Sequence, residues 1–152
     1  MMENNRLQNQ PCLVRLNEMK LVGLPITHPF NGTSEILKQA RERFEERRTE
    51  IQNVQNPERY ICAHFNSEVI FTYCFCMEVS EFGELPEGMI SFTIPAHRYG
   101  AIRCDGDPYE SIHSYLNNHG IINNPKALAL EVYHFANPKF PEEVDVYIPT
   151  HE

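Results

Sequence analysis

The chain has 152 residues, of which 41% are hydrophobic and 22% are charged, so its length and composition fit one globular domain with an ordinary core. Its 13 Lys and Arg residues against 21 Asp and Glu residues give a formal net charge of -8, which disfavours nucleic acid and anionic lipid as partners. No apolar run approaches the ~20 residues that a membrane-spanning helix needs, and the first residues lack the apolar stretch of a signal peptide. We therefore expect a cytoplasmic protein that binds neither nucleic acid nor membranes.

The five cysteines are odd in number, and most of them lie in apolar, strand-like runs, which is typical of reduced and buried thiols. Cys74 and Cys76 would share one face of a strand, but no second pair supplies the remaining ligands of a zinc site. The histidines are scattered over different elements, and no Gly-rich phosphate loop is present. The sequence therefore predicts no disulfide, no metal site and no cofactor.

The N-terminal residues 1–12 are rich in Asn and Gln and have no apolar period, so we expect a disordered tail. The strand-like stretch 13–27 follows. It has two apolar patches that flank Asn17 and Glu18, which predicts one bent or bulged strand.

A helix and a hairpin complete the first half of the chain. Either Thr33 or Ser34 can cap the helix, and apolar residues then recur near a 3.6-residue period, at Ile36, Leu37, Ala40, Phe44 and Ile51. The aromatic and apolar runs 60–65 and 69–79 are separated by a turn-like segment and predict a β-hairpin.

The second half repeats this order of elements. Strand-like runs lie at 89–104, 127–138 and 144–149. Between the first two, Asp107 is a natural N-cap, Pro108 suits the first helical position, and Gly120 ends the helix. The chain therefore predicts a single α+β domain over residues 13–150, built from two βαββ units at about 13–79 and 89–150. Joined side by side, they would form a curved antiparallel sheet with pseudo-twofold symmetry, two helices on one face and a ligand cleft on the other.

Three segments resemble a known family, the GyrI-like small-molecule-binding domain, which is also the effector-binding domain of some MerR-type and AraC-type multidrug-responsive regulators. They are residues 76–102, Glu131–Tyr133 and Asp145–Pro149, and the resemblance extends over roughly residues 13–150. It implies a cleft for hydrophobic, often cationic compounds, with an acidic residue at the position of Glu131 among aromatic rings. No helix-turn-helix precedes the resemblance, so we expect a stand-alone form that does not read DNA itself.

Strand alternation assigns side chains to the two faces of the sheet. Glu131 and Tyr133 share one face, and we expect the apolar Leu130 and Val132 to pack on the helices instead. In the last strand Val144, Val146 and Ile148 are expected to face the helices, which leaves Asp145 and Tyr147 toward the cleft. Glu131 and Tyr147 would then be neighbours.

The other candidate ligand-binding residues come from the hairpin. Phe71, Tyr73, Phe75 and Met77 share one strand face, and the repeat matches Tyr73 with Tyr147, so this face is assigned to the cleft, although simple core packing explains Phe71, Phe75 and Met77 equally well. The predicted ligand-binding set is Glu131, Tyr147, Tyr73, Phe71, Phe75 and Tyr133.

The candidate residues and the family resemblance together suggest three alternative functions. A carboxylate among rings is costly to leave unpaired, which favours a binding protein for hydrophobic, cationic small molecules. Some members of the resembling family are hydrolases of strained, cyclopropane-bearing compounds, and here Glu131 would be the general base and a Tyr hydroxyl the donor. The third alternative is an interaction module that inhibits a partner enzyme or regulator, but the sequence does not identify that partner.

Overall fold

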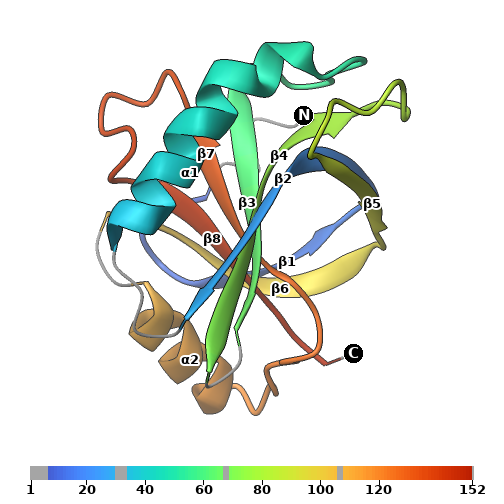
Figure 1. Ribbon diagram of the computed structural model, residues 1–152. Helices are drawn as coiled ribbons and strands as arrows, with labels where there is room; N and C mark the ends of the chain where they lie inside the picture. Colours follow the sequence, from blue (N-terminus) through green and yellow to red (C-terminus); the bar gives the residue numbers. More distant parts are fainter. Residues whose placement is uncertain (1–6, 30–33, 67–68, 106–107, 152) are drawn as a thin grey trace.

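The structure is a computed structural model that describes residues 7–29, 34–66, 69–105 and 108–151 (Figure 1). Its elements in chain order are β1 (Cys12–Leu16), β2 (Met19–Pro29), α1 (Ser34–Arg47), the 3₁₀ turn η2 (Arg48–Glu50), β3 (Arg59–Asn66), β4 (Ile70–Val79), β5 (Ile90–Ile94), β6 (His97–Cys104), α2 (Tyr109–Asn118), β7 (Ala129–His134) and β8 (Val144–Pro149). The eight strands form one antiparallel sheet in the order β1-β6-β8-β7-β3-β4-β2-β5. The predicted α+β class is confirmed.

The strand order has the predicted pseudo-twofold symmetry. The triplet β6-β8-β7 mirrors the triplet β2-β4-β3, and the two halves join where β7 pairs with β3. In each half the helix follows the outer strand of the triplet, so each half is a βαββ unit.

Two stretches that the sequence presents as single strands are each divided. The first becomes β1 and β2, and the second becomes β5 and β6. These strands are exchanged between the halves, because β1 pairs with β6 while β5 pairs with β2. The second break falls at Pro95, which lacks the N–H that a strand in the ladder donates.

The two helices lie on the same face of the sheet. Helix α1 belongs to a core cluster with Cys62, and helix α2 to a cluster with Val146. Both residues are cross-strand partners of Glu131, and such partners point to the same face. Figure 1 shows both helices on the left and β1, β5 and β6 curled round on the right, so the sheet is a half-barrel. A third core cluster, which includes Leu130 and Val132, fills the concave face.

Local signals explain where the helices sit and end. Helix α2 buries Ile112 and Leu116, and it ends where Gly120 adopts a φ of 66° and the Ile121 N–H donates to the Leu116 carbonyl at 2.9 Å. The expected caps Thr33 and Asp107 lie outside the described residues. Neither helix of the described chain has the length and hydropathy to cross a bilayer.

Residues 7–11, which the sequence places in a loose tail, are packed against the sheet. The Leu7 side chain is buried, and the Gln8 carbonyl accepts a hydrogen bond from the Arg103 N–H at 2.8 Å. The segment therefore extends the line of β1 along the edge of β6. All five cysteines are free thiols, three of them buried.

Candidate functional site

Glu131 lies near the middle of the sheet, on the face that the helices cover. Its cross-strand partners are Cys62 on β3 and Val146 on β8, which belong to the α1 and α2 core clusters respectively. The carboxylate is therefore between the two helices, and its side chain is only 18% exposed.

Hydroxyl groups and an imidazole surround the Glu131 carboxylate. The Tyr109 hydroxyl donates to Oε2 at 2.5 Å, and the Tyr133 hydroxyl donates to Oε1 at 2.9 Å. Nε2 of His64 lies 3.5 Å from Oε2 and 3.2 Å from the Tyr109 hydroxyl. Among the described residues, no Lys or Arg pairs with this carboxylate. We call Glu131, Tyr109, Tyr133 and His64 the Glu131 cluster.

The partners in the Glu131 cluster are electrically neutral at neutral pH. Burial lowers the pKa of His64, although the Glu131 charge opposes this shift. Burial and the Glu131 charge both raise the pKa of Tyr109 and of Tyr133, so both remain hydroxyl donors. The negative charge of Glu131 is thus hydrogen-bonded but not paired with a positive side chain.

Aromatic rings continue from the Glu131 cluster along the same face. The Tyr73 ring lies 5.5 Å from that of His64 and stacks on that of His28 at 5.8 Å, and Phe71 meets Tyr73 edge-on at 6.0 Å. Burial, followed by the Glu131 charge, raises the pKa of Tyr73 to about 12. This row of rings begins at His64, beside the partly buried carboxylate of Glu131.

Tyr133 and Phe75 extend the aromatic set toward helix α1. Tyr133 stacks on Tyr60 with centroids 4.9 Å apart, and Phe75 packs against both Tyr60 and Phe44 of α1. Phe75 is buried, whereas Phe71, Tyr73 and Tyr133 retain partial exposure.

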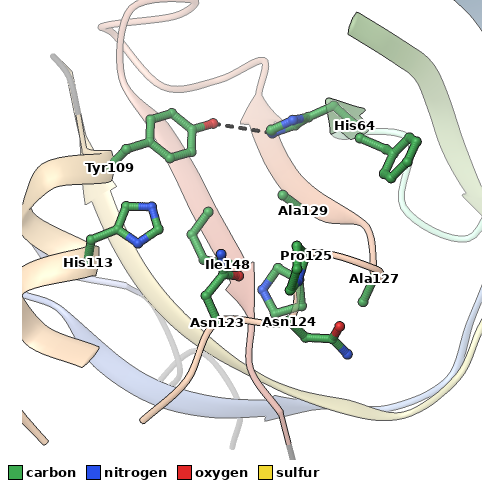
Figure 2. A pocket seen from close by; sticks show the side chains of 11 residues that line it. His64, Tyr109, His113, Asn123, Asn124, Pro125, Ala127, Ala129 and Ile148 are labelled. Atoms are coloured by element: carbon green, nitrogen blue, oxygen red, sulfur yellow. Dashed lines mark hydrogen bonds between the residues drawn. The ribbon is translucent and has the colours of Figure 1, made fainter. Parts of the chain in front are cut away.

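A pocket of about 210 Å³ opens beside the Glu131 cluster, between helix α2, β3 and the loop before β7 (Figure 2). We call it the α2 pocket. Tyr109 and His64 line it, and Figure 2 shows the hydrogen bond between them at its upper edge. The other lining residues are Phe65, His113, Asn123, Asn124, Pro125, Ala127, Ala129, Ile148 and Pro149. Two of the three residues that contact Glu131 therefore form the wall between the acid and the pocket.

Two predictions about strand faces are wrong. Leu130 and Val132 face the concave core rather than the helices, and Glu131 faces the helices. Tyr147 is the cross-strand partner of Leu130, so it lies on the opposite face of the sheet from Glu131 and is not its neighbour. The physical reason is that both faces are buried under apolar cores, so an apolar residue does not indicate which face the helices cover.

The rest of the predicted set does share a face with Glu131, but this is the face that the helices cover, so its assignment to a cleft on the opposite face is also wrong. Tyr73 and Tyr147, which the repeat was expected to match, lie on opposite faces. Phe71, Tyr73, Phe75 and Tyr133 share its face, and Val144, Val146 and Ile148 face the helices as predicted. Sequence reasoning missed Tyr109 and His64. Tyr109 is 22 residues from Glu131 and 45 residues from His64, and only the folded sheet brings them together.

This architecture of two βαββ halves is that of the GyrI-like effector-binding domains. The model of the family described as integron-associated effector binding protein matches residues 12–150, and the chain belongs to this family.

Individual relatives agree with this assignment. The transcriptional regulator BrlR of Pseudomonas aeruginosa is 34% identical over 120 residues, which cover 71% of this chain and 44% of BrlR. The chain thus spans less than half the length of that regulator. The structure of SAV2435 bound to tetraphenylphosphonium has a TM-score of 0.71 at 15% identity and covers 93% of this chain and 94% of its own. The EcmrR C-terminal domain has a TM-score of 0.70 at 14% identity and covers 94% and 98%.

Proposed function

We propose that the protein binds hydrophobic cations at the Glu131 cluster, as an effector-binding module. The observation that carries this proposal is a carboxylate, 18% exposed, whose partners are all neutral. A partly desolvated charge without a counter-ion gains most from a cation that brings its own apolar surface. The ring faces of residues such as Tyr73 would each add about 0.5–2 kcal/mol of attraction for a cation. The tetraphenylphosphonium bound to SAV2435 is a ligand of this class.

The size of the α2 pocket indicates how such a ligand would enter. At about 210 Å³ the pocket is smaller than the roughly 300–1,000 Å³ typical of drug-sized ligands. Tyr109 stands between the pocket and Glu131. A ligand as large as tetraphenylphosphonium would therefore displace the Tyr109 hydroxyl and take its place beside the carboxylate.

A titration with tetraphenylphosphonium tests the proposal. We expect micromolar binding, which corresponds to about 8 kcal/mol, and a loss of at least about tenfold in Glu131→Gln, which keeps the hydrogen-bonding shape but removes the charge. Triphenylphosphine oxide, which has similar rings and no charge, should bind more weakly. Glu110→Gln on the exposed side of α2 makes the same change in net charge and should leave the affinity unchanged. Equal affinity in Glu131→Gln and Glu110→Gln would show that Glu131 does not attract the ligand.

A second candidate function is hydrolysis of a strained, cyclopropane-bearing compound. It is favoured by a specific contact, since Glu131, neutral His64 and the Tyr109 hydroxyl meet at the wall of a pocket. His64 or Glu131 would accept a proton from water as its oxygen bonds to one ring carbon, while Tyr109 stabilises the carbonyl that takes up the electrons of the broken carbon–carbon bond. A proton then adds at the other carbon, so the net change is the addition of one water.

The two candidates differ in turnover. An activated cyclopropyl ketone incubated with the protein should gain the mass of one water if the protein is a hydrolase, and Glu131→Gln should abolish this gain. A ligand that binds and is recovered unchanged favours the effector-binding function.

A further inference from the structure

A second and larger cavity lies on the other face of the sheet from Glu131. Its volume is about 780 Å³, and it is lined by residues 7–8 and 10–16 together with Arg59 of β3 and Tyr147 of β8. We call it the β1 cavity. Tyr147 belongs to the concave core cluster, as do the partly buried Val14 and Leu16 on β1. The β1 cavity therefore opens into the hollow of the half-barrel, and none of its described lining residues contributes to the Glu131 cluster.

One wall of the β1 cavity is the N-terminal segment. Leu7 is 6% exposed, Gln8 is tied to β6 through its carbonyl, and strand β1 follows with Cys12, Val14 and Leu16 on the concave side. The β1 cavity has a volume within the roughly 300–1,000 Å³ of typical small-molecule sites, and part of this wall is formed by the apolar side chains of Leu7, Pro11, Val14 and Leu16. It therefore suits the hydrocarbon portion of a ligand.

Two polar side chains project from the sheet at the floor of the β1 cavity. Among the described residues, nothing hydrogen-bonds the Tyr147 hydroxyl. Burial, followed by the nearby Asp145 charge, raises the pKa of Tyr147 to about 12, although the charges of Arg59 and Arg103 oppose this shift. The Tyr147 hydroxyl is therefore a hydrogen-bond donor at neutral pH, and it is close enough to Arg59 to feel its charge. Arg59 makes a hydrogen bond of 3.1 Å from one terminal nitrogen to Glu78, and its Nε is buried without a partner.

The charged side chains in the described lining of the β1 cavity are both positive. Arg15 and Arg59 are the only charged residues of its described lining. Two acids lie beside these residues. Glu78, whose side chain is 13% exposed, forms an ion pair with Arg59 at 3.1 Å. Asp145, whose side chain is 6% exposed, accepts two hydrogen bonds from Arg103, at 2.5 and 2.9 Å, and contacts His134 at 2.8 Å. A guanidinium that has five donors and uses one of them on Glu78 can still hold a carboxylate. The described lining contains no Asp or Glu that could pair with a cation.

We propose that the β1 cavity is a second ligand site, specific for a lipophilic monocarboxylate whose head group binds Arg59 and the Tyr147 hydroxyl and whose apolar chain lies along Pro11, Val14 and Leu16. The two faces of the sheet then select opposite charges. This inference does not depend on the cation site, because the two sites have no described residue in common.

The probe is dodecanoate, compared with dodecanol and with dodecyltrimethylammonium, which carry the same chain with no charge or a positive charge. Because a lipophilic cation is also expected to bind at the Glu131 cluster, the comparison uses the full chain with Glu131→Gln. Isothermal titration of this variant should show that dodecanoate binds at least tenfold more tightly than either analogue. Arg59→Gln should weaken dodecanoate at least tenfold, and Tyr147→Phe, which removes only the hydroxyl, should weaken it severalfold. Arg43→Gln on the exposed side of α1 makes the same change in net charge and should have no effect.

Methyl NMR spectra of the wild-type chain locate the bound ligand without relying on a variant. Dodecanoate should shift the signals of Val14 and Leu16 and leave that of Ile148 in the α2 pocket unchanged. Glu131→Gln should keep its dodecanoate affinity, which separates failure of this inference from failure of the cation site. Equal affinity for dodecanoate and dodecanol, unchanged binding in Tyr147→Phe, or shifts confined to the α2 pocket would each overturn the proposal.

Discussion

The Tyr109 hydroxyl, from the first residue of helix α2, lies 2.5 Å from Oε2 of Glu131, on a strand in the middle of the sheet. Burial and the Glu131 charge raise the pKa of this phenol, so it donates to the carboxylate at neutral pH. The position of α2 and the charge of the candidate site are therefore linked by a short hydrogen bond.

Replacing Tyr109 with Phe should lower stability and raise cation affinity. The change leaves Oε2 of a mostly buried carboxylate without its shortest hydrogen bond, which costs about 1–3 kcal/mol. A less satisfied carboxylate gains more from a bound cation, so tetraphenylphosphonium should bind more tightly. Urea unfolding and ligand titration measure the two effects. Tyr115→Phe makes the same change on the same helix, and equal results for the two variants would contradict the prediction.

Acidification should destabilise the protein and weaken cation binding through His64. Burial lowers the pKa of His64 below its usual 6.5, so between these two values the unfolded chain binds more protons than the folded one. This contribution to stability is complete above about pH 6.5 and is lost as the pH falls through the folded-state pKa. A protonated His64 would also place a positive charge 3.5 Å from Glu131 and repel a cationic ligand.

Unfolding and tetraphenylphosphonium titrations at pH 7.5 and pH 5.5 check this prediction. His64→Gln should flatten both pH dependences, whereas His151→Gln, at an exposed position near the C-terminus, should behave like the wild type. If stability and tetraphenylphosphonium affinity fall equally with pH in the wild type and in His64→Gln, a group other than His64 causes the pH dependence.

The elements of this fold were predictable because their signals are local. Apolar residues at helical spacing, such as Ala40 and Phe44, are buried where the pattern places them, and Gly120 ends α2 as predicted. The exchange of β1 and β5 between the halves was not predictable, because the pairing partner of an edge strand depends on the rest of the sheet.

The candidate site was only partly predictable. A lone Glu in the apolar run around residue 131 marked the central acid, but the side chains on both sides of that strand are buried, so the pattern did not fix which face the helices cover. His64 and Tyr109 gave no signal, because a hydrogen bond between residues 45 positions apart depends on tertiary structure.

The ion cluster on the concave face should contribute strongly to stability. Burial alone would raise the pKa of Asp145, but hydrogen bonds from His134 and Arg103 hold it below its usual value. Asp145→Asn should cost about 3 kcal/mol, because it leaves the partly buried guanidinium of Arg103, whose side chain is 15% exposed, without its charged partner.

The ion pair of Asp145 with Arg103 also makes the stability of the protein depend on pH in the acid range. Because the folded pKa of Asp145 is depressed, its stabilisation is present above its unfolded value of 3.8 and is lost as the pH falls through the folded value. Asp105→Asn removes a salt bridge whose side chains are 61% and 55% exposed, and it should change the free energy of unfolding by less than about 1 kcal/mol. Urea unfolding at neutral pH compares the two variants, and similar losses would mean that Asp145 is not effectively buried.

Gly23 on β2 and Gly100 on β6 occupy corresponding strands of the two halves, yet alanine should affect them differently. A Cβ at Gly23 would lie 2.0 Å from the Phe75 carbonyl oxygen, so the backbone of β4 would have to move, at a cost of about 3 kcal/mol or more. A Cβ at Gly100 would meet only the Leu116 and Ile112 side chains of α2, at 3.1 and 3.4 Å. A small shift of α2 relieves that contact for about 1 kcal/mol, and the same shift moves Tyr109 relative to Glu131. Gly100→Ala should therefore keep the fold but change the affinity for tetraphenylphosphonium. Gly23→Ala should lower the urea midpoint of unfolding much more than Gly100→Ala does. The opposite ranking of the two midpoints would refute this packing argument.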